Sequence, residues 1–297
     1  ELERIARAYS EAISPLIGEK IDIPAPDVNT NGKIMSWMVD AYENVVKHSA
    51  PGVFTGKPVE FGGSLARTEA TGYGVNFAAV QALEKLGKDV KGATYAIQGF
   101  GNVGYHTGYY AHKAGAKIVA VSTVDVAIYN ENGLDMEAII KEFQTKGFIT
   151  NEAGYGKEIS NAELLALDVD VLAPCALENQ LTSENAGKVR AKIVVEGANG
   201  PTTPEADVIL RQNGVLVVPD ILANCGGVVV SYFEWVQNLQ GYYWEFDEVQ
   251  EKETVVLRRA FRDIWNLAQE YDVDLRTASY MMSIRRVEKA MKLRGWY

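Results

Sequence analysis

Short apolar runs alternate with longer segments of helical periodicity through the middle of the chain. Nearly continuous apolar strands that alternate with helices are typical of a parallel sheet covered on both faces. The expected strands lie at 94–98, 117–122, 169–173, 192–196 and 215–218. The expected helices of this region lie at 68–86, 105–113, 134–143 and 204–213. The pattern therefore predicts an α/β fold with a doubly wound, Rossmann-like domain.

Helical patterns also dominate the two ends of the chain. The first residues form a charged amphipathic segment, and an apolar stripe predicts a helix at 33–47. From Val228 onwards the pattern predicts three helices, at 228–240, 245–271 and 275–293. The segment 51–63 is punctuated by glycine and proline, and we expect a domain boundary there.

A glycine pattern follows the first expected strand directly. Gly99, Gly101 and Gly104 form the spacing G-x-G-x-x-G between that strand and a helix. In nucleotide-binding units the first glycine allows a sharp turn, the second lets the backbone approach a pyrophosphate, and the third lets the helix pack on the strand. The helix N-terminus also directs N–H groups and partial positive charge at the turn, which suits a diphosphate. The alternative is a purely structural turn, since a chain with 27 glycines can contain this spacing by chance.

Composition argues against several classes of function. The 297 residues carry a formal net charge of −10 and no basic stripe, so no nucleic-acid or anionic-membrane partner is expected. No apolar run approaches the ~18 residues of a membrane span, and the start of the chain is unlike a signal peptide. Cys175 and Cys225 do not suggest a disulfide framework, which fits a reducing cytoplasm. His106 and His112 are too far apart for an i,i+4 ligand pair, so no metal site is expected.

Several further motifs, taken together and in order, resemble the glutamate dehydrogenases of the Glu/Leu/Phe/Val dehydrogenase family. The likeness covers essentially the whole chain. The matching stretches are 24–31, 55–58, 62–72, the glycine turn, 196–205 and 219–238. The resemblance implies an enzyme that transfers a hydride from the α-carbon of L-glutamate to NAD or NADP and hydrolyses the imine to 2-oxoglutarate and ammonia. It also implies a homo-oligomer, which would be a homohexamer for the complete enzyme.

The resemblance assigns the cofactor residues. Thr71, Asn199 and Asn224 are expected to lie against the nicotinamide and its ribose, where amide and hydroxyl groups fix which ring face meets the substrate. The alternative is that Asn199 and Asn224 only shape turns beside glycines, which asparagine does readily. The pyrophosphate is assigned to Gly99, Gly101, Asn102, Val103 and Gly104.

The end of the second expected strand bears on the choice between NAD and NADP. Thr123 stands where many relatives have an aspartate, and Asp125 follows two residues later. These two residues are the candidates for binding the adenosine ribose. No lysine or arginine lies between Thr123 and Gly133, and Asp125 would repel a 2′-phosphate. NAD is therefore favoured over NADP, although a cation from a distant loop would reverse this preference.

The resemblance also assigns the chemistry. Asp27, in a loop stiffened by two prolines, is expected to transfer protons, and the alternative is that it caps the following helix. Ser231 is expected to donate a hydrogen bond to the side-chain carboxylate of the substrate, and the alternative is a bond to its own helix backbone. Arg67 is expected either to order the substrate loop or to pair with Glu69.

One departure from the family concerns lysine. In the family, lysines upstream of this segment bind the substrate carboxylates, and one lies in a Gly-Gly-x-Lys-Gly-Gly motif that the 297 residues do not contain. We therefore expect the chain to begin inside the substrate domain of a longer enzyme, and to be weakly active or inactive alone. On this interpretation 1–57 is a remnant of the substrate domain, 58–227 binds the dinucleotide, and 228–297 forms helices that bridge back.

Two other functions stay open at this point. A dehydrogenase of a branched or aromatic amino acid would require apolar groups in place of Ser231 and the lysines. A non-catalytic dinucleotide-binding module would explain the absent lysine motif, but it has no need of Asp27, Asn224 and Ser231.

Overall fold

The structure is a computed structural model, and it describes residues 1–27 and 29–296. The chain forms two compact units. The first contains residues 1–70 and 227–253, and the second contains 71–226 and 254–297. Val28, which belongs to the expected proline loop, lies outside the described residues.

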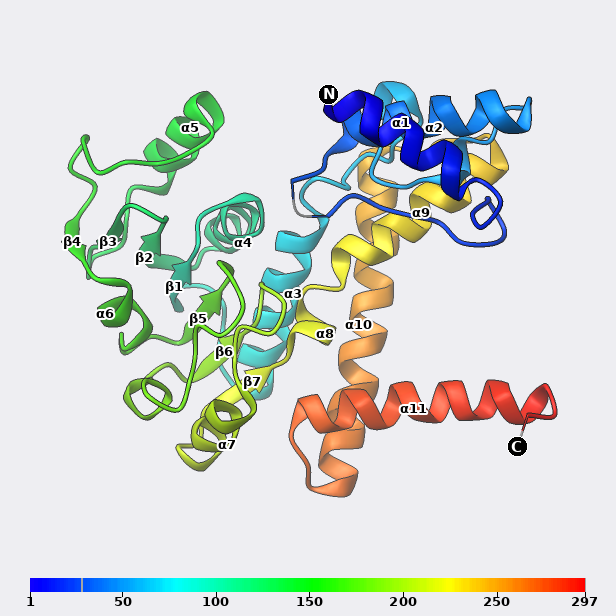
Figure 1. The fold of residues 1–297 in the computed structure, drawn as a ribbon. Helices are drawn as coiled ribbons and strands as arrows, with labels where there is room; N and C mark the ends of the chain where they lie inside the picture. The colour runs from blue at the N-terminus through cyan, green and yellow to red at the C-terminus, as the bar shows by residue number, and fades with distance from the viewer. Residues whose placement is uncertain (28, 297) are drawn as a thin grey trace. The chain divides into compact units, whose positions relative to one another are not determined.

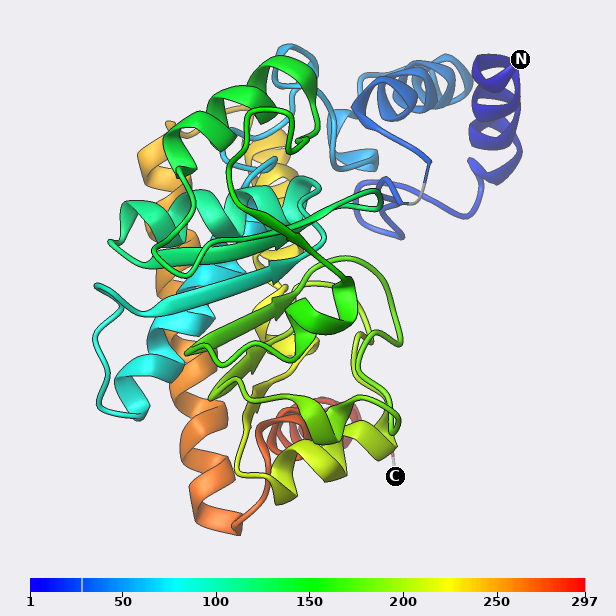
Figure 2. The ribbon, with the colours of Figure 1, turned by 90° about the vertical axis from the view of Figure 1, so that its left-hand side faces the viewer.

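The second unit is built on a seven-stranded sheet within the described residues (Figure 1, Figure 2). The strand order is β4-β3-β2-β1-β5-β6-β7. Neighbours from β2 through β7 along this order pair in parallel, whereas β3 pairs antiparallel with both β2 and β4. The bounds are β1 (Thr94–Gln98), β2 (Lys117–Ser122), β3 (Ala127–Tyr129), β4 (Lys157–Ile159), β5 (Val171–Pro174), β6 (Ile193–Val195) and β7 (Leu216–Val218).

Helices cover both faces of this sheet. Alternate residues of a strand point to opposite faces, so Tyr95 and Ile97 of β1 join one hydrophobic cluster and Ala96 joins another. The first cluster includes side chains of α3, α4, α5, α10 and α11, and the second includes those of α6 and α7. The bounds are α3 (Ala70–Lys85), α4 (Asn102–Lys113), α5 (Met136–Lys146), α6 (Asn161–Leu165), η3 (Ala186–Lys188), α7 (Pro204–Gln212), α8 (Asp220–Ala223), α10 (Phe246–Tyr271) and α11 (Leu275–Leu293).

The doubly wound fold expected from the sequence is confirmed. The five expected strands and the expected helices are present, with boundaries shifted by a few residues at most. The antiparallel pair β3 and β4 was not predicted. Each of these strands has only three residues, and such short runs carry too little alternation to be recognised.

The first unit is helical. Its hydrophobic clusters join α1 to α2 around Phe54, and join the residues before α3 to α9 around Val230 and Phe233. The bounds are α1 (Leu2–Ile13), α2 (Gly32–Val46), η1 (Pro51–Val53), η2 (Val59–Phe61) and α9 (Gly226–Gln240). None of the helices in the described part of the chain is both long and apolar enough to cross a membrane.

Candidate active site

The three glycines of the turn after β1 differ in what a Cβ at each position would contact. Gly99 has a φ of +84°, which favours glycine, and a Cβ there would lie 2.5 Å from the Cα of Ala176. A Cβ on Gly104 would lie 2.0 Å from the carbonyl oxygen of Gly99. A Cβ on Gly101 would meet no atom within 4 Å. Gly99 and Gly104 are thus required by packing, whereas Gly101 keeps open the space in front of α4.

The N-terminus of α4 closes this space on one side. Its N-cap is Gly101, and no side chain caps the helix. The N–H groups of the first turn of a helix have no acceptor within the helix, and the helix dipole adds positive potential. The turn is held to the end of β2, because Phe100 N–H donates to the carbonyl of Ser122 at 2.6 Å. An open, uncapped helix N-terminus behind a glycine fits the pyrophosphate of a dinucleotide.

The segment after β2 forms a tight turn around Thr123. The Oγ1 atom of Thr123 accepts hydrogen bonds from the backbone N–H groups of Asp125, at 3.3 Å, and Val126, at 3.2 Å. Asp125 is exposed at this turn. The structure therefore places an exposed carboxylate just beyond β2, and the predicted ribose contact of Thr123 and Asp125 stays a prediction.

The two asparagines predicted at the nicotinamide lie together. The Nδ2 atom of Asn224, which follows α8, donates to Oδ1 of Asn199, which follows β6, at 2.7 Å. Their amides thus bond to each other, and their contact with the nicotinamide stays a prediction. Thr71 lies in the first turn of α3, one turn before Gly74, where a Cβ would lie 3.2 Å from the carbonyl oxygen of Ala223. Packing therefore brings the start of α3 beside the segment that carries Asn224.

In the first unit, the predicted substrate residues Arg67 and Ser231 are also in contact. The Nε atom of Arg67 donates to the Oγ atom of Ser231 at 2.9 Å. No ion pair joins Arg67 to Glu69 among the described residues, and the role of Arg67 in ordering the substrate loop stays a prediction. Burial lowers the pKa of Arg67, and the charges of Glu234 and Glu253 oppose this shift.

Asp27 does not cap the helix that follows it. The N-cap of α2 is Asn31, whose side chain accepts a hydrogen bond from Ile34 N–H at 3.2 Å. Asp27 instead bonds to Thr30 through its backbone, as its N–H donates to Thr30 Oγ1 at 2.6 Å. Asp27 is exposed, and its carboxylate accepts no hydrogen bond from the residues that the structure describes. The proton-transfer role of Asp27 stays a prediction.

Residues 62–295 match the family model Glutamate/Leucine/Phenylalanine/Valine dehydrogenase. The chain belongs to this dehydrogenase family. Residues 1–44 match a second model, the Glu/Leu/Phe/Val dehydrogenase dimerisation domain. The resemblance inferred from the sequence motifs is thereby confirmed.

Individual members of the family match the whole chain. It is 54% identical to a NAD-specific glutamate dehydrogenase of Clostridioides difficile, and it covers 72% of that protein. It is 50% identical to a glutamate dehydrogenase of Thermotoga maritima, and it covers 71% of that protein. The solved structure of glutamate dehydrogenase from Peptoniphilus asaccharolyticus matches all of the chain at 43% identity with a TM-score of 0.87, and 71% of that structure is covered. The hetero-hexameric glutamate dehydrogenase of Thermus thermophilus, in its Leu-bound form, matches at 34% identity with a TM-score of 0.93, and 70% of it is covered.

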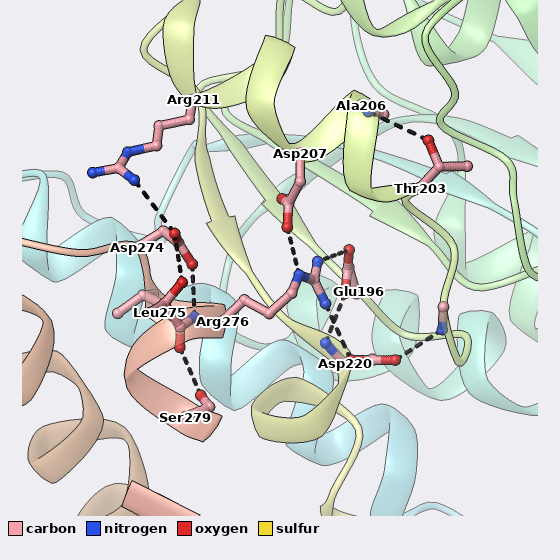
Figure 3. Close-up of polar contacts among 12 residues, drawn as sticks. Glu196, Thr203, Ala206, Asp207, Arg211, Asp220, Asp274, Leu275, Arg276 and Ser279 are labelled. Atoms are coloured by element: carbon pink, nitrogen blue, oxygen red, sulfur yellow. Dashed lines mark hydrogen bonds and ion pairs between the residues drawn. The ribbon is translucent and has the colours of Figure 1, made fainter. Parts of the chain in front are cut away.

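In this dehydrogenase three carboxylates surround one arginine, an arrangement that the sequence did not reveal. Arg276, in the first turn of α11, forms ion pairs with Glu196, Asp207 and Asp220 (Figure 3). Burial disfavours the charge of Arg276, but its hydrogen bonds to Glu196 and Asp207 outweigh this and raise its pKa. Burial raises the pKa of Glu196, and Arg276 opposes that shift. Glu196 and Arg276 are 80 residues apart along the chain, so no local pattern connects them.

A second unexpected feature of the dehydrogenase is a buried ion pair in the first unit. The Nζ atom of Lys57 lies 2.7 Å from Oε1 of Glu234, and both side chains are 0% exposed. Lys57 also donates to the carbonyl of Phe54 at 2.6 Å, and Glu234 accepts from Gly56 N–H at 2.9 Å. Burial lowers the pKa of Lys57, and the charge of Glu234 opposes this shift. The pair joins the Thr-Gly-Lys-Pro loop to α9, the helix that carries Ser231.

A third feature is the carboxyl group of Glu253. It is fully buried, and within the described part of the chain neither of its oxygens has a hydrogen-bond partner. Burial, and to a smaller extent the charge of Glu69, raise its pKa to about 9, and Arg67 opposes the shift. Glu253 is therefore a neutral acid near pH 7 close to the Arg67 guanidinium. Its sequence context, an ordinary charged stretch of a long helix, gave no indication of this.

The described residues contain no group of three or more histidine, cysteine, aspartate or glutamate side chains arranged to hold a metal ion. Cys175 and Cys225 form no disulfide within the described residues.

Proposed function

We propose that this chain carries the NAD-dependent oxidative deamination of L-glutamate to 2-oxoglutarate and ammonia. The observation that carries the proposal is the 54% identity, over the whole chain, to a protein named NAD-specific glutamate dehydrogenase. NAD, when bound, supplies the hydride acceptor. The remaining tasks fall to side chains of the protein, which must hold the cofactor, move protons and recognise the substrate.

The cofactor residues proposed here follow from the glycine turn and the paired asparagines. The backbone of Gly99, Gly101, Asn102, Val103 and Gly104 would hold the pyrophosphate at the N-terminus of α4. Asn199 and Asn224 present amide groups on adjacent loops and, with Thr71, would orient the carboxamide of the nicotinamide. Rigid orientation of this kind is worth several kcal/mol of a reaction barrier.

The preference for NAD rests on the turn around Thr123. Asp125 provides an exposed carboxylate for ribose hydroxyls, and the same charge repels a 2′-phosphate. The related proteins from Clostridioides difficile and Staphylococcus aureus are named NAD-specific, which supports this preference.

The substrate contacts rest on Ser231 and its partner. Because the Oγ atom of Ser231 accepts a hydrogen bond from Arg67, its own O–H is available to donate elsewhere. A donor hydroxyl beside a guanidinium suits a carboxylate, and it disfavours the apolar side chains of leucine, valine or phenylalanine. The glutamate branch of the family is therefore preferred to the branched or aromatic alternative.

Proton transfer is assigned to Asp27. Its loop is held by the bond between Asp27 N–H and Thr30, while its carboxylate stays exposed. A positioned acid or base of this kind typically contributes about 10²–10⁴ in rate. A non-catalytic module would have no use for this free carboxylate or for the Arg67–Ser231 pair.

Self-association is part of the proposal. Residues 1–44 match a dimerisation domain, and the relative from Thermus thermophilus is described as hetero-hexameric, which supports an oligomer and, in the complete enzyme, the homohexamer that we expect. A cytoplasmic location is also proposed, because a chain with two cysteines and no disulfide framework suits a reducing compartment.

The test combines binding and turnover. Calorimetry with NAD and NADP should show tighter binding of NAD. The NADH formation that the chain shows, which we expect to be weak, should then depend on glutamate and be far slower with leucine, valine or phenylalanine. Equal rates with leucine would contradict the assignment of Ser231, and no binding of either nucleotide would contradict the glycine turn as a pyrophosphate site. If the chain bound NAD but formed no NADH from glutamate, only the cofactor-binding part of the proposal would stand.

A further inference from the structure

The position of Arg276 is unfavourable for its own helix. Arg276 is the second residue of α11, after the N-cap Asp274. A positive charge in the first turn opposes the helix dipole, at a typical cost of about 0.3–1 kcal/mol. The guanidinium nevertheless binds three carboxylates, with Nη2 at 2.6 Å from Glu196 and Nη1 at 3.4 Å from Asp220 (Figure 3). The ion pairs with carboxylates outside α11 therefore explain why an arginine stands at this unfavourable position of the helix.

The carboxylates lie on segments that follow neighbouring strands. Glu196 comes directly after β6, and Asp220 begins α8 just after β7. Oε2 of Glu196 accepts a hydrogen bond from the Asp220 N–H at 2.8 Å. Oδ2 of Asp220 in turn accepts from the Gly200 N–H at 2.8 Å. Arg276 thus sits at the centre of a network that fixes the backbone of both segments.

The same two segments carry the paired asparagines. Asn199 directly precedes Gly200, and the Asn224 N–H donates to the carbonyl of Asp220 at 3.0 Å. Asn199 is therefore next to Gly200, whose N–H the network binds, and Asn224 is hydrogen-bonded directly to Asp220. The bond between the two amides therefore also joins the two segments that the Arg276 network holds.

We propose that Arg276 is a positioning residue that sets the mutual geometry of Asn199 and Asn224 and thereby the orientation of the nicotinamide carboxamide. The inference rests on the proposed function, in which the two amides contact the nicotinamide. A planar guanidinium with donors in a fixed fork holds several carboxylates at once, which the single ammonium of lysine cannot do.

The variants must separate positioning from folding. Loss of the charge in Arg276→Met would leave the buried Glu196 carboxylate without its cation, and such changes are strongly destabilising. Arg276→Lys keeps the positive charge but removes the planar guanidinium and its fixed arrangement of donors. The matched control is Arg211→Ala, because Arg211 pairs with Asp274 at the same end of α11, at 3.4 Å, and among the described residues forms no ion pair with Glu196 or Asp220.

The first measurement is hydrogen exchange in the full chain without ligand. Arg276→Lys should speed amide exchange in peptides that cover 196–200 and 219–225, and Arg211→Ala should leave both peptides unchanged. Unchanged exchange in the lysine variant, or equal acceleration by Arg211→Ala, would overturn the proposed network role.

The second measurement compares NAD with ADP-ribose, which lacks the nicotinamide, by calorimetry. Arg276→Lys should weaken NAD binding by about 10-fold, since small misplacements at such a site are costly, while ADP-ribose binding should change by less than about twofold. An equal loss for both ligands would show a general structural role and overturn the proposal. If the unmodified chain binds the two ligands equally, the proposed nicotinamide contacts fail, and the proposal that Arg276 orients the nicotinamide carboxamide is overturned with them; the hydrogen-exchange result then reports only whether Arg276 orders the two loops.

Discussion

Asn224 donates a hydrogen bond from Nδ2 to Oδ1 of Asn199 across 2.7 Å, although the two residues follow different strands of the sheet. The bond fixes the outward-facing donors and acceptors of both amides relative to each other. A pair of this kind should act as a unit in cofactor binding.

The first prediction concerns this coupling. Asn199→Ala and Asn224→Ala should each weaken NAD binding by about 10-fold, and the double variant should be little worse than either single one, because residues in contact are non-additive. ADP-ribose binding should be unchanged in all three variants. Calorimetric affinities give the cycle, and additive losses would show that the two amides act independently.

The second prediction separates two glycines of the turn. Gly101→Ala places a methyl group in open space at a φ of −86°, so it should cost at most about 1 kcal/mol of stability while hindering the approach of a pyrophosphate. Gly104→Ala places a Cβ 2.0 Å from the Gly99 carbonyl oxygen and should destabilise the fold by about 3 kcal/mol or more. Denaturant unfolding and NAD calorimetry measure the two effects. A stable Gly101→Ala protein with unchanged NAD affinity would contradict the assigned pyrophosphate position.

The third prediction concerns proton transfer. Asp27→Asn should lower kcat by about 10²–10⁴ while NAD affinity and stability stay unchanged. Asn31→Ala is the matched control, since it removes the cap of α2 and should cost about 1 kcal/mol of stability with little effect on kcat. Steady-state kinetics and thermal unfolding distinguish the two. A loss of stability without a loss of rate in Asp27→Asn would argue against a role in proton transfer.

The fourth prediction concerns the buried pair of Lys57 and Glu234. Lys57→Met should destabilise the protein by about 3–5 kcal/mol, because it leaves a buried carboxylate without its cation. The double variant Lys57→Met with Glu234→Gln should be more stable than Lys57→Met alone. Urea unfolding measures both, and a Lys57→Met protein as stable as the parent would contradict a charged pair.

The fifth prediction concerns Glu253 and pH. Its pKa of about 9 in the folded state lies above the ordinary value of 4.5, so the folded protein holds this proton more tightly than the unfolded chain. Its contribution to stability is therefore fully present below about pH 4.5 and is lost as the pH rises through about 9. Glu253→Gln should remove this loss, at most a few kcal/mol, and should raise Tm relative to the parent at pH 8 more than at pH 5. The exposed Glu270→Gln serves as the control, and parallel pH curves for Glu253→Gln and the parent would contradict a neutral buried acid.

The sequence by itself determined the parts of this protein that depend on neighbouring residues. Short apolar runs and segments of helical periodicity are local patterns. The β1–α4–β2 unit, the other long helices and the parallel strands followed from them. The glycine spacing at Gly99, Gly101 and Gly104 was also readable, because it directly follows an expected strand and precedes an expected helix. The family motifs added Asn199 and Asn224, which lie in loops, and Ser231 on α9.

Only the tertiary structure decided which distant side chains meet. The cap of α2 belongs to Asn31 and not to Asp27, a choice between two good capping residues that depends on where the helix begins. Lys57 meets Glu234 across 177 positions, and Arg276 meets Glu196 across 80. Such pairs carry no periodicity, since packing of whole elements brings them together and burial then fixes their charges. For the same reason Glu253 reads as an ordinary helical glutamate in the sequence and becomes a neutral buried acid only in the fold.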